Sequence, residues 1–233
     1  MTRFQGKVAL ISAAGAGIGR ATAMIVAREG GTVVGVDVEP VALDRLTADV
    51  GAAGGRALAL RADALDAASV EGAVRRAVDA YARIDILVNG VGGSTIVGHP
   101  AAELDELTLE EWQKLLHFNL TGTFLFCHAV IPVMKRQRSG KIVNLSSIAG
   151  RGLSRESSSA YATAKGGIIA LTRKLAFELG PHGITVNAIA PSLTLSERIR
   201  PRWEQRSAEA QAAEKAGTPI AWLGIARVPI EPQ

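Results

Sequence analysis

Tyr161 and Lys165 stand four residues apart, and residues with that spacing share one face of a helix. A phenol beside a fixed cation can exchange a proton near neutral pH, because the cation favours the phenolate. Ser146 and Ser147 close an apolar run at residues 141–145. A hydroxyl there can hydrogen-bond a substrate oxygen on which charge develops. By itself the tyrosine–lysine pair would be an ordinary exposed helix face, so its meaning depends on the residues around it.

A glycine-rich turn with Gly15, Gly17 and Gly19 follows the first apolar run, residues 7–12. Small residues let the backbone approach a pyrophosphate, which a helix N-terminus near Gly17 stabilises. Asp37 ends the next strand, 18 residues after Gly19, near the ~20-residue offset at which a carboxylate binds the adenosine ribose hydroxyls. Because that carboxylate repels a 2′-phosphate, we expect NAD rather than NADP. A tight turn and a strand-end aspartate are the structural alternatives.

The apolar runs that must position these residues alternate between strand length and helix length. Strand runs are apolar throughout, which is typical of a parallel sheet covered by helices on both faces. Repeated βα units predict an α/β fold: a doubly wound, Rossmann-type sheet of six strands in three αβα layers. The expected strands are residues 7–12, 32–37, 56–62, 84–89, 141–145 and 184–190; the expected helices are 18–29, 41–50, 67–82, 109–136, kinked by Pro132, and 160–179.

No repeat, low-complexity tract or linker divides the chain, so residues 1–233 are expected to form one dinucleotide-binding and catalytic domain. After Pro191 the sequence becomes charged and rich in alanine. We interpret residues 192–217 as a mobile lid over the substrate. No strand is expected in residues 218–233.

The composition excludes several classes of protein. With 48% hydrophobic residues and a formal net charge of +4, the chain is neither disordered nor fibrous. The basic cluster at residues 135–138 follows a helical pattern, so we expect a helix end there and no nucleic-acid partner. The single Cys127 fits a reducing compartment. Because no signal pattern and no run near the ~20 apolar residues of a membrane span is found, a cytoplasmic protein without a membrane partner is expected. No ligand spacing predicts a metal site.

Two further strand ends carry small or polar residues. Ala62 and Asp63 end the third strand, where the carboxylate can accept a bond from the adenine amine or cap the next helix. Asn89 ends the fourth strand, and Gly90 after it lets a cofactor pass close by. Because the carboxyl ends of parallel strands meet at one edge of the sheet, these residues are expected beside the glycine turn.

In combination these motifs resemble the short-chain dehydrogenase/reductase family of the compact, 3-oxoacyl reductase-like kind, over about residues 7–196. The family's glycine motif falls on residues 12–19, with Ala13 in place of the first glycine. Its P-G pair falls on Pro191 and Ser192, so that glycine also differs. The cofactor contacts that the resemblance and the strand ends predict are Ser12, Gly15, Gly17, Ile18, Gly19, Asp37, Ala62, Asp63, Asn89, Gly90, Tyr161, Lys165, Pro191 and Ser196.

The resemblance implies a catalytic tetrad of Asn119, Ser147, Tyr161 and Lys165. Ser147 matches the family register better than Ser146, although its spacing to Tyr161 is longer than usual. In this family's roles the tyrosine is the general acid/base, the lysine holds the nicotinamide ribose, and the asparagine holds a water that relays protons. The resemblance thus implies hydride transfer between NAD(H) and a secondary alcohol or ketone. A dinucleotide-binding redox sensor or inactive paralogue is the alternative, and a 3-oxoacyl thioester reductase is the rival within the enzymes.

Substrate contacts are less clearly marked than the catalytic residues. Ser147 and Tyr161 are joined by Ser94, Leu153, Ser154, Arg155, Glu156 and residues 193–199 as candidates. The resemblance also implies a homo-oligomer, a tetramer or a dimer. Family members usually run further, through an additional helix and a seventh strand, so the chain looks shortened. Residues 184–190 are therefore expected to form an exposed edge strand.

Overall fold

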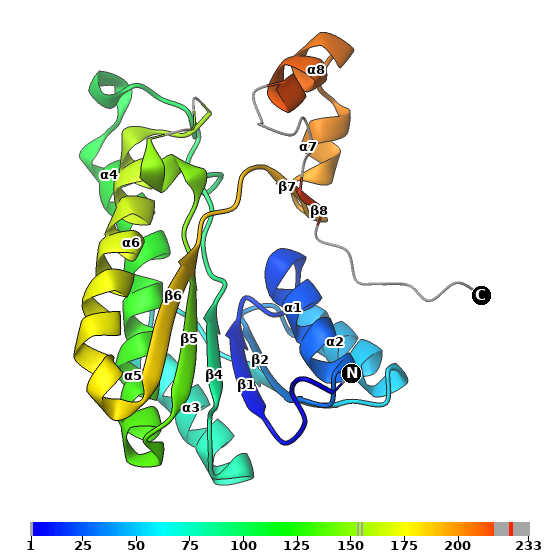
Figure 1. Ribbon diagram of the computed structural model, residues 1–233. Coiled ribbons are helices and arrows are strands. Elements are labelled where there is room, and N and C mark those ends of the chain that lie inside the picture. Colours follow the sequence, from blue (N-terminus) through cyan, green and yellow to red (C-terminus); the bar gives the residue numbers. More distant parts are fainter. Residues whose placement is uncertain (1, 153, 155, 217–223, 226–233) are drawn as a thin grey trace.

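Six parallel strands form the centre of the molecule, in the order β3-β2-β1-β4-β5-β6 (Figure 1). The computed structural model describes residues 2–152, 154, 156–216 and 224–225. The strand order changes direction between β1 and β4, which is where open α/β sheets bind ligands. The predicted doubly wound sheet is confirmed. Its strands are β1 (Val8–Ser12), β2 (Thr32–Asp37), β3 (Arg56–Arg61), β4 (Ile86–Asn89), β5 (Gly140–Leu145) and β6 (Ile184–Ile189).

Helices cover the sheet on two faces and complete three layers (Figure 1). On one face, Ala9 and Ile11 of β1 pack with α1 and α2; on the other, Val8 and Leu10 pack with α3, α5 and α6. This split follows from the period of two along a strand, which sends successive side chains to opposite faces. These helices are α1 (Gly17–Arg28), α2 (Pro40–Ala52), α3 (Ala67–Tyr81), α5 (Gly122–Gln137) and α6 (Ser159–Leu179); short 3₁₀ turns span Leu104–Glu106, Ile148–Arg151 and Gly180–His182.

The strand β6 forms one edge of the sheet, as expected. Its burial alternates, with Ile184 and Val186 buried and Thr185 and Asn187 exposed. The apolar side chain of Ile189 at its end is 53% exposed. A strand covered on one face only shows this alternation.

One long helical stretch, Leu109–Gln137, contains a π-helical turn. It consists of α4 (Leu109–Leu116), the π turn His117–Thr121 and α5. Contrary to the expectation from sequence, its length and mean hydropathy of 1.3 would allow a membrane span. The buried Phe126, Val130 and Met134 of this stretch pack in the core against the sheet. We therefore interpret it as a core helix.

The chain beyond β6 crosses the carboxyl ends of the strands and forms a separate small unit (Figure 1). Its elements are β7 (Thr194–Leu195), α7 (Arg200–Glu204) and α8 (Ala208–Ala216). β7 pairs with β8 (Gly224–Ile225), so the expectation of no strand in residues 218–233 is wrong. Trp203 is buried beside Leu195, Leu193 and Ile199, which anchors α7.

Candidate active site

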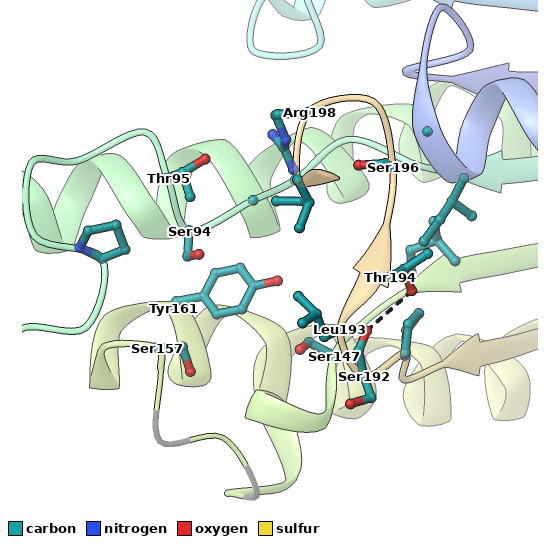
Figure 2. A pocket seen from close by; sticks show the side chains of 18 of the residues that line it. Ser94, Thr95, Ser147, Ser157, Tyr161, Ser192, Leu193, Thr194, Ser196 and Arg198 are labelled. Atoms are coloured by element: carbon teal, nitrogen blue, oxygen red, sulfur yellow. Dashed lines mark hydrogen bonds between the residues drawn. The ribbon is translucent and has the colours of Figure 1, made fainter. Parts of the chain in front are cut away.

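Ser147, Tyr161 and Lys165 line one cavity of about 730 Å³ at the carboxyl ends of the strands (Figure 2). Ser158 caps the start of α6 by accepting a hydrogen bond from the backbone N–H of Tyr161, a common way for a helix to begin. The helix then presents Tyr161 and Lys165 one turn apart. Ser147 lies two residues after the end of β5 and caps the 3₁₀ turn that follows by accepting from the N–H of Ala149, 3.1 Å away.

Lys165 is almost completely buried, with 3% of its surface exposed. Its Nζ donates to the carbonyl oxygen of Leu145 at 2.9 Å and lies 5.7 Å from the centre of the Tyr161 ring. Burial, followed by the positive charge of Arg198, lowers the pKa of Lys165 to about 8. The ammonium is thus held in place by β5 while it faces the cavity.

The Tyr161 phenol has its pKa raised above the ordinary value, chiefly by burial. A hydrogen bond with Ser147 and the charge of Arg198 oppose this rise without cancelling it. The net shift therefore favours the neutral phenol. Desolvation of an anion outweighs these two favourable contacts.

Asn119 lies in the π turn and is fully buried, outside the lining of the cavity. Its Nδ2 donates to the carbonyl oxygens of Gly93 and Leu115, and its Oδ1 accepts from the N–H of Gly93. A Cβ on Gly92 would lie 2.7 Å from the Nζ of Lys165 and 2.8 Å from the Oδ1 of Asn119. The amide thus braces the loop against which Lys165 rests. π turns recur at functional sites, and the water-relay role remains a prediction.

The glycine turn forms the opposite end of the cavity, with Gly17, Ile18 and Gly19 in its lining. A Cβ on Gly19 would lie 2.1 Å from the carbonyl oxygen of Ala13, so only glycine fits there. Ala13 itself has φ 52°, the left-handed conformation that glycine adopts most easily. The turn therefore keeps a shape typical of glycine although this residue is alanine.

A carboxylate already occupies the N-terminus of α1. The Oε2 of Glu197 accepts a hydrogen bond from the N–H of Gly17 at 2.9 Å, and its Oε1 lies 3.5 Å from a guanidinium nitrogen of Arg20. Helix N-termini attract anions through unpaired N–H groups and the helix dipole. Glu197 shows that this turn accepts an anion where a pyrophosphate is expected.

Asp37 lines the cavity beside this turn and is linked to it. Its carboxylate accepts from the N–H of Gly15 at 2.9 Å and from those of Val38 and Glu39. Gly15 lies behind the cavity lining, where a Cβ would approach Asp37 to 2.9 Å. The predicted juxtaposition of acid and glycine turn is therefore present.

Ala62 and Asp63 do not line the cavity. Ala62 is buried and its N–H donates to the carbonyl oxygen of Asp37. The carboxylate of Asp63 accepts from the N–H of Leu65 at 2.9 Å and so closes a turn. Asp66 caps α3 instead. The suggestion that Asp63 caps this helix is wrong.

Ser12 and Asn89 also stay behind the cavity. The hydroxyl of Ser12 accepts from the N–H of Gly90 at 3.0 Å, which fixes the loop after β4. Asn89 pairs in register with Asn144 of β5, and its Nδ2 donates to the Oδ1 of that residue at 2.8 Å and to Cys127 Sγ at 3.3 Å. The Asn89 side chain therefore points into the core, contrary to the prediction, and positions the loop instead of touching a ligand. Burial raises the pKa of Cys127 to about 12, in keeping with an unreactive thiol.

Most of the remaining predicted residues line the cavity. Leu153 and Arg155 lie outside the described residues. Ser192 is not among the described non-glycine residues with positive φ, so the change from glycine imposes no left-handed backbone there. Figure 2 shows Tyr161 reaching in from α6, with Ser94 and Thr95 on one side and Ser192 and Leu193 on another. The other predicted residues in the lining are Gly90, Ser154, Glu156, Pro191, Thr194, Ser196, Arg198 and Ile199.

Arg198 and Glu197 lie within the predicted segment 193–199, but nothing in the sequence singled them out. The guanidinium of Arg198 rests against the backbone of Gly93, because a Cβ there would be 2.9 Å from one of its nitrogens. The one sequence signal that could have found Arg198 is its position two residues after Ser196, which was itself predicted to contact the cofactor.

Comparisons with known proteins agree with this geometry. The profile described as short chain dehydrogenase matches residues 7–207. The short-chain reductase protein NovJ of Streptomyces niveus is 41% identical over 92% of this chain and 83% of its own length. The 3-oxoacyl-[acyl-carrier-protein] reductase of Synechocystis sp. is 37% identical over 84% of this chain and 78% of its own. A crystal structure of NAD⁺-bound xylitol dehydrogenase, 30% identical, superposes with a TM-score of 0.85 over 96% of this chain and 89% of its own. The chain therefore belongs to the short-chain dehydrogenase family, oxidoreductases that act on CH–OH or C=O groups.

Proposed function

We propose that this protein transfers a hydride between NAD(H) and the carbinol carbon of a secondary alcohol, or in reverse to a ketone, with Tyr161 as general acid/base. The observation that carries this proposal is the shared cavity of Ser147, Tyr161 and Lys165 with the glycine turn and Asp37. A binding site for the cofactor and the acid/base group thus face the same space. NAD⁺, when bound, supplies the hydride acceptor.

The residues fit a dinucleotide at two places. The N–H of Gly17, which donates to the Glu197 carboxylate here, would hold the pyrophosphate. Asp37 would hold the adenosine ribose. Its negative charge beside Gly15 supports NAD over NADP, because a 2′-phosphate would meet it directly. Arg45, which donates to the carbonyl oxygen of Gly15 at 3.1 Å, is the cation that would favour NADP.

Titration of both cofactors decides this preference. NAD⁺ should bind more tightly than NADP⁺, and Asp37→Ala should narrow the difference. If NADP⁺ binds more tightly than NAD⁺ to the wild-type protein, the preference for NAD is refuted.

The proton step follows from the polar groups in the cavity. In oxidation, the phenolate oxygen of Tyr161 takes the proton of the alcohol hydroxyl as the C–H bond releases its hydride. Ser147 donates a hydrogen bond to the same substrate oxygen and holds it near the phenol. In reduction, the protonated phenol, which burial favours, donates this proton to the carbonyl oxygen. Lys165 would hold the nicotinamide ribose, and its charge beside the ring would favour the phenolate.

A spectrophotometric scan of NAD⁺ reduction across secondary alcohols tests the activity. Tyr161→Phe should abolish turnover and leave the affinity for NAD unchanged. Tyr81→Phe, which alters the other tyrosine of the chain, is the matched control and should keep full turnover. Undiminished turnover in Tyr161→Phe would refute the proposed role.

A dinucleotide-binding protein without turnover is the alternative from another class. The altered glycine position 13 favours it, because an alanine with positive φ can weaken the phosphate site. Tight NAD binding without oxidation of any alcohol, or reduction of any ketone or 3-oxoacyl thioester, would support this alternative.

Two substrate classes fit the reacting centre within the enzyme class. The Synechocystis relative is named a 3-oxoacyl reductase, and the NAD⁺-bound neighbour is a xylitol dehydrogenase. Both names describe chemistry at a secondary carbinol or ketone. We favour the alcohol or ketone class for this chain, since Asp37 supports NAD.

We also infer a homo-oligomer, a dimer or a tetramer. Leu109 of α4, Phe124 of α5 and Phe177 of α6 are large apolar side chains that are exposed, Phe177 to 81%. All three belong to the same layer of helices. Light scattering after size exclusion should show more than one chain per particle, and a monomer at micromolar concentration would refute the inference.

A further inference from the structure

Three arginines from the chain after β6 line the cavity, and they differ in the carboxylate partners that they have among the described residues. Arg206 is paired with Glu156 and with Glu214. Within the part of the chain that the structure describes, Arg198 and Arg202 have no carboxylate at ion-pair distance. The catalytic end of the cavity also contains Lys165. It therefore carries an excess of positive charge.

Arg198 is held close to the reacting groups. A Cβ on Gly93 would lie 2.9 Å and 3.0 Å from its two terminal nitrogens, so glycine at this position gives the guanidinium room. Its charge favours the phenolate of Tyr161 and disfavours the ammonium of Lys165. Figure 2 shows Arg198 in the same pocket as Ser94 and Tyr161.

The acid next to Arg198 in sequence does not neutralise it. Glu197 turns to the other end of the cavity, where it accepts from Gly17 and pairs with Arg20. The expected pyrophosphate position is at that end too. A cofactor bound there would leave Arg198 facing the space beside Tyr161, where the substrate reacts.

An unpaired guanidinium at the catalytic end needs an anion to compensate its charge beside Lys165. Its planar fork of N–H donors matches a carboxylate in two parallel hydrogen bonds. Resting on the Gly93 backbone, it is preorganised for such a ligand. We propose that Arg198 binds a carboxylate carried by the substrate, so that the substrate is a hydroxy acid or the corresponding oxo acid. This proposal rests on the proposed function, because it concerns the same cavity.

Matched pairs of acid and ester test the proposal by kinetics. The 2-, 3- and 4-hydroxypentanoates and their methyl esters would each be oxidised with NAD⁺, and the ratio of kcat/KM for acid to ester measured. We expect one spacing at which the acid is clearly preferred. Arg198→Ala should lower that ratio roughly 10- to 100-fold. Arg198→Lys, which keeps the charge but loses the fork, should recover part of it.

Arg200→Ala provides the control. Arg200 is two residues away, pairs with Glu204 at 4.0 Å and does not line the cavity. The variant Arg200→Ala removes the same charge from the same segment without changing the cavity lining. Its acid-to-ester ratio of kcat/KM should therefore stay at the wild-type value. A general electrostatic effect would lower the ratio in both variants and overturn the proposal. Equal kcat/KM for acid and ester at all three spacings would also overturn it.

A binding measurement separates this proposal from the proposed function. The 2-, 3- and 4-oxopentanoates and their methyl esters would be titrated into the protein–NADH complex and followed by calorimetry. Tighter binding of an acid than of its ester, lost in Arg198→Ala while NADH still binds, supports the carboxylate site even if no alcohol is oxidised. Equal binding of acids and esters overturns it even if neutral alcohols are oxidised.

Discussion

Removing the carboxylate of Glu197 should strengthen cofactor binding. This carboxylate accepts the hydrogen bond of the Gly17 N–H at 2.9 Å and lies 3.5 Å from Arg20. A pyrophosphate needs the same N–H group, and two anions cannot share it. On the proposed function, the cofactor must therefore displace Glu197 when it binds.

The size of the effect follows from the exposure of the contact. A hydrogen bond to a charged partner contributes about 1.5–3 kcal/mol when it is buried. The Glu197 side chain is 46% exposed, and solvent screening reduces the contribution to about 1 kcal/mol. Release of this contact weakens NAD binding by the same amount, so Glu197→Ala should lower the Kd roughly fivefold. The Kd of Glu197→Gln should lie between those of the wild type and of Glu197→Ala, because the amide oxygen still accepts a hydrogen bond but has no charge.

Titration of NADH followed by its fluorescence measures this change. Glu204→Ala is the control, since it removes an exposed acid from the same segment that contacts Arg200 rather than the glycine turn. Its Kd should equal that of the wild type. A Kd for Glu197→Ala that is unchanged or higher would refute the displacement of Glu197 by the cofactor.

Three further predictions follow from the backbone and from Lys165. Ala13→Gly should stabilise the protein by about 0.5–1 kcal/mol, because relief of the left-handed alanine exceeds the added entropy of the unfolded chain. Thermal unfolding should show a rise in Tm of roughly 1–4 °C. Ala82→Gly, also at positive φ, should give a similar rise in Tm without altering the affinity for NADH. Gly92→Ala should lower kcat roughly 100-fold by displacing Lys165 and Asn119, and normal kcat would exclude this clash. Because Lys165 has its folded pKa lowered to about 8, the folded state binds fewer protons than the unfolded state above that pH. The stability of the wild type relative to Lys165→Met should therefore rise by about 1.5 kcal/mol from pH 8 to 9.5 and stay nearly constant below about pH 7, as urea unfolding would measure. A flat difference from pH 7 to 9.5 would show that the lysine titrates normally.

Local patterns predicted the sheet and the cavity well, because each depends on residues close in sequence. The expected strand at residues 32–37 matches β2, Thr32–Asp37. The helix spacing of Tyr161 and Lys165 places both in one cavity, as expected. Strands and helix faces are marked by the spacing of their residues, and the glycine turn is marked by its offset from Asp37.

The errors concern side chains whose direction depends on distant partners. Asn89 could have faced either the cavity or the core, and its register with Asn144, 55 residues later, decides for the core. Asp63 was a candidate cap for the helix after β3, but α3 begins at Ala67, so Asp66 caps it instead. Arg198 reaches Gly93 because of the path of the chain after β6, which no local pattern specifies.

The π turn His117–Thr121 places Asn119 by means of one extra residue. A π turn holds one residue more than the α-helical turn it replaces. Because the widened turn absorbs that residue, deleting it would restore regular helical bonding and leave α4 and α5 with the faces they now present. Phe126, Val130 and Met134 would stay in the core, but Asn119 would lose the position from which it bonds Gly93. Such a deletion would therefore spare the helix layer and loosen the loop against which Lys165 rests.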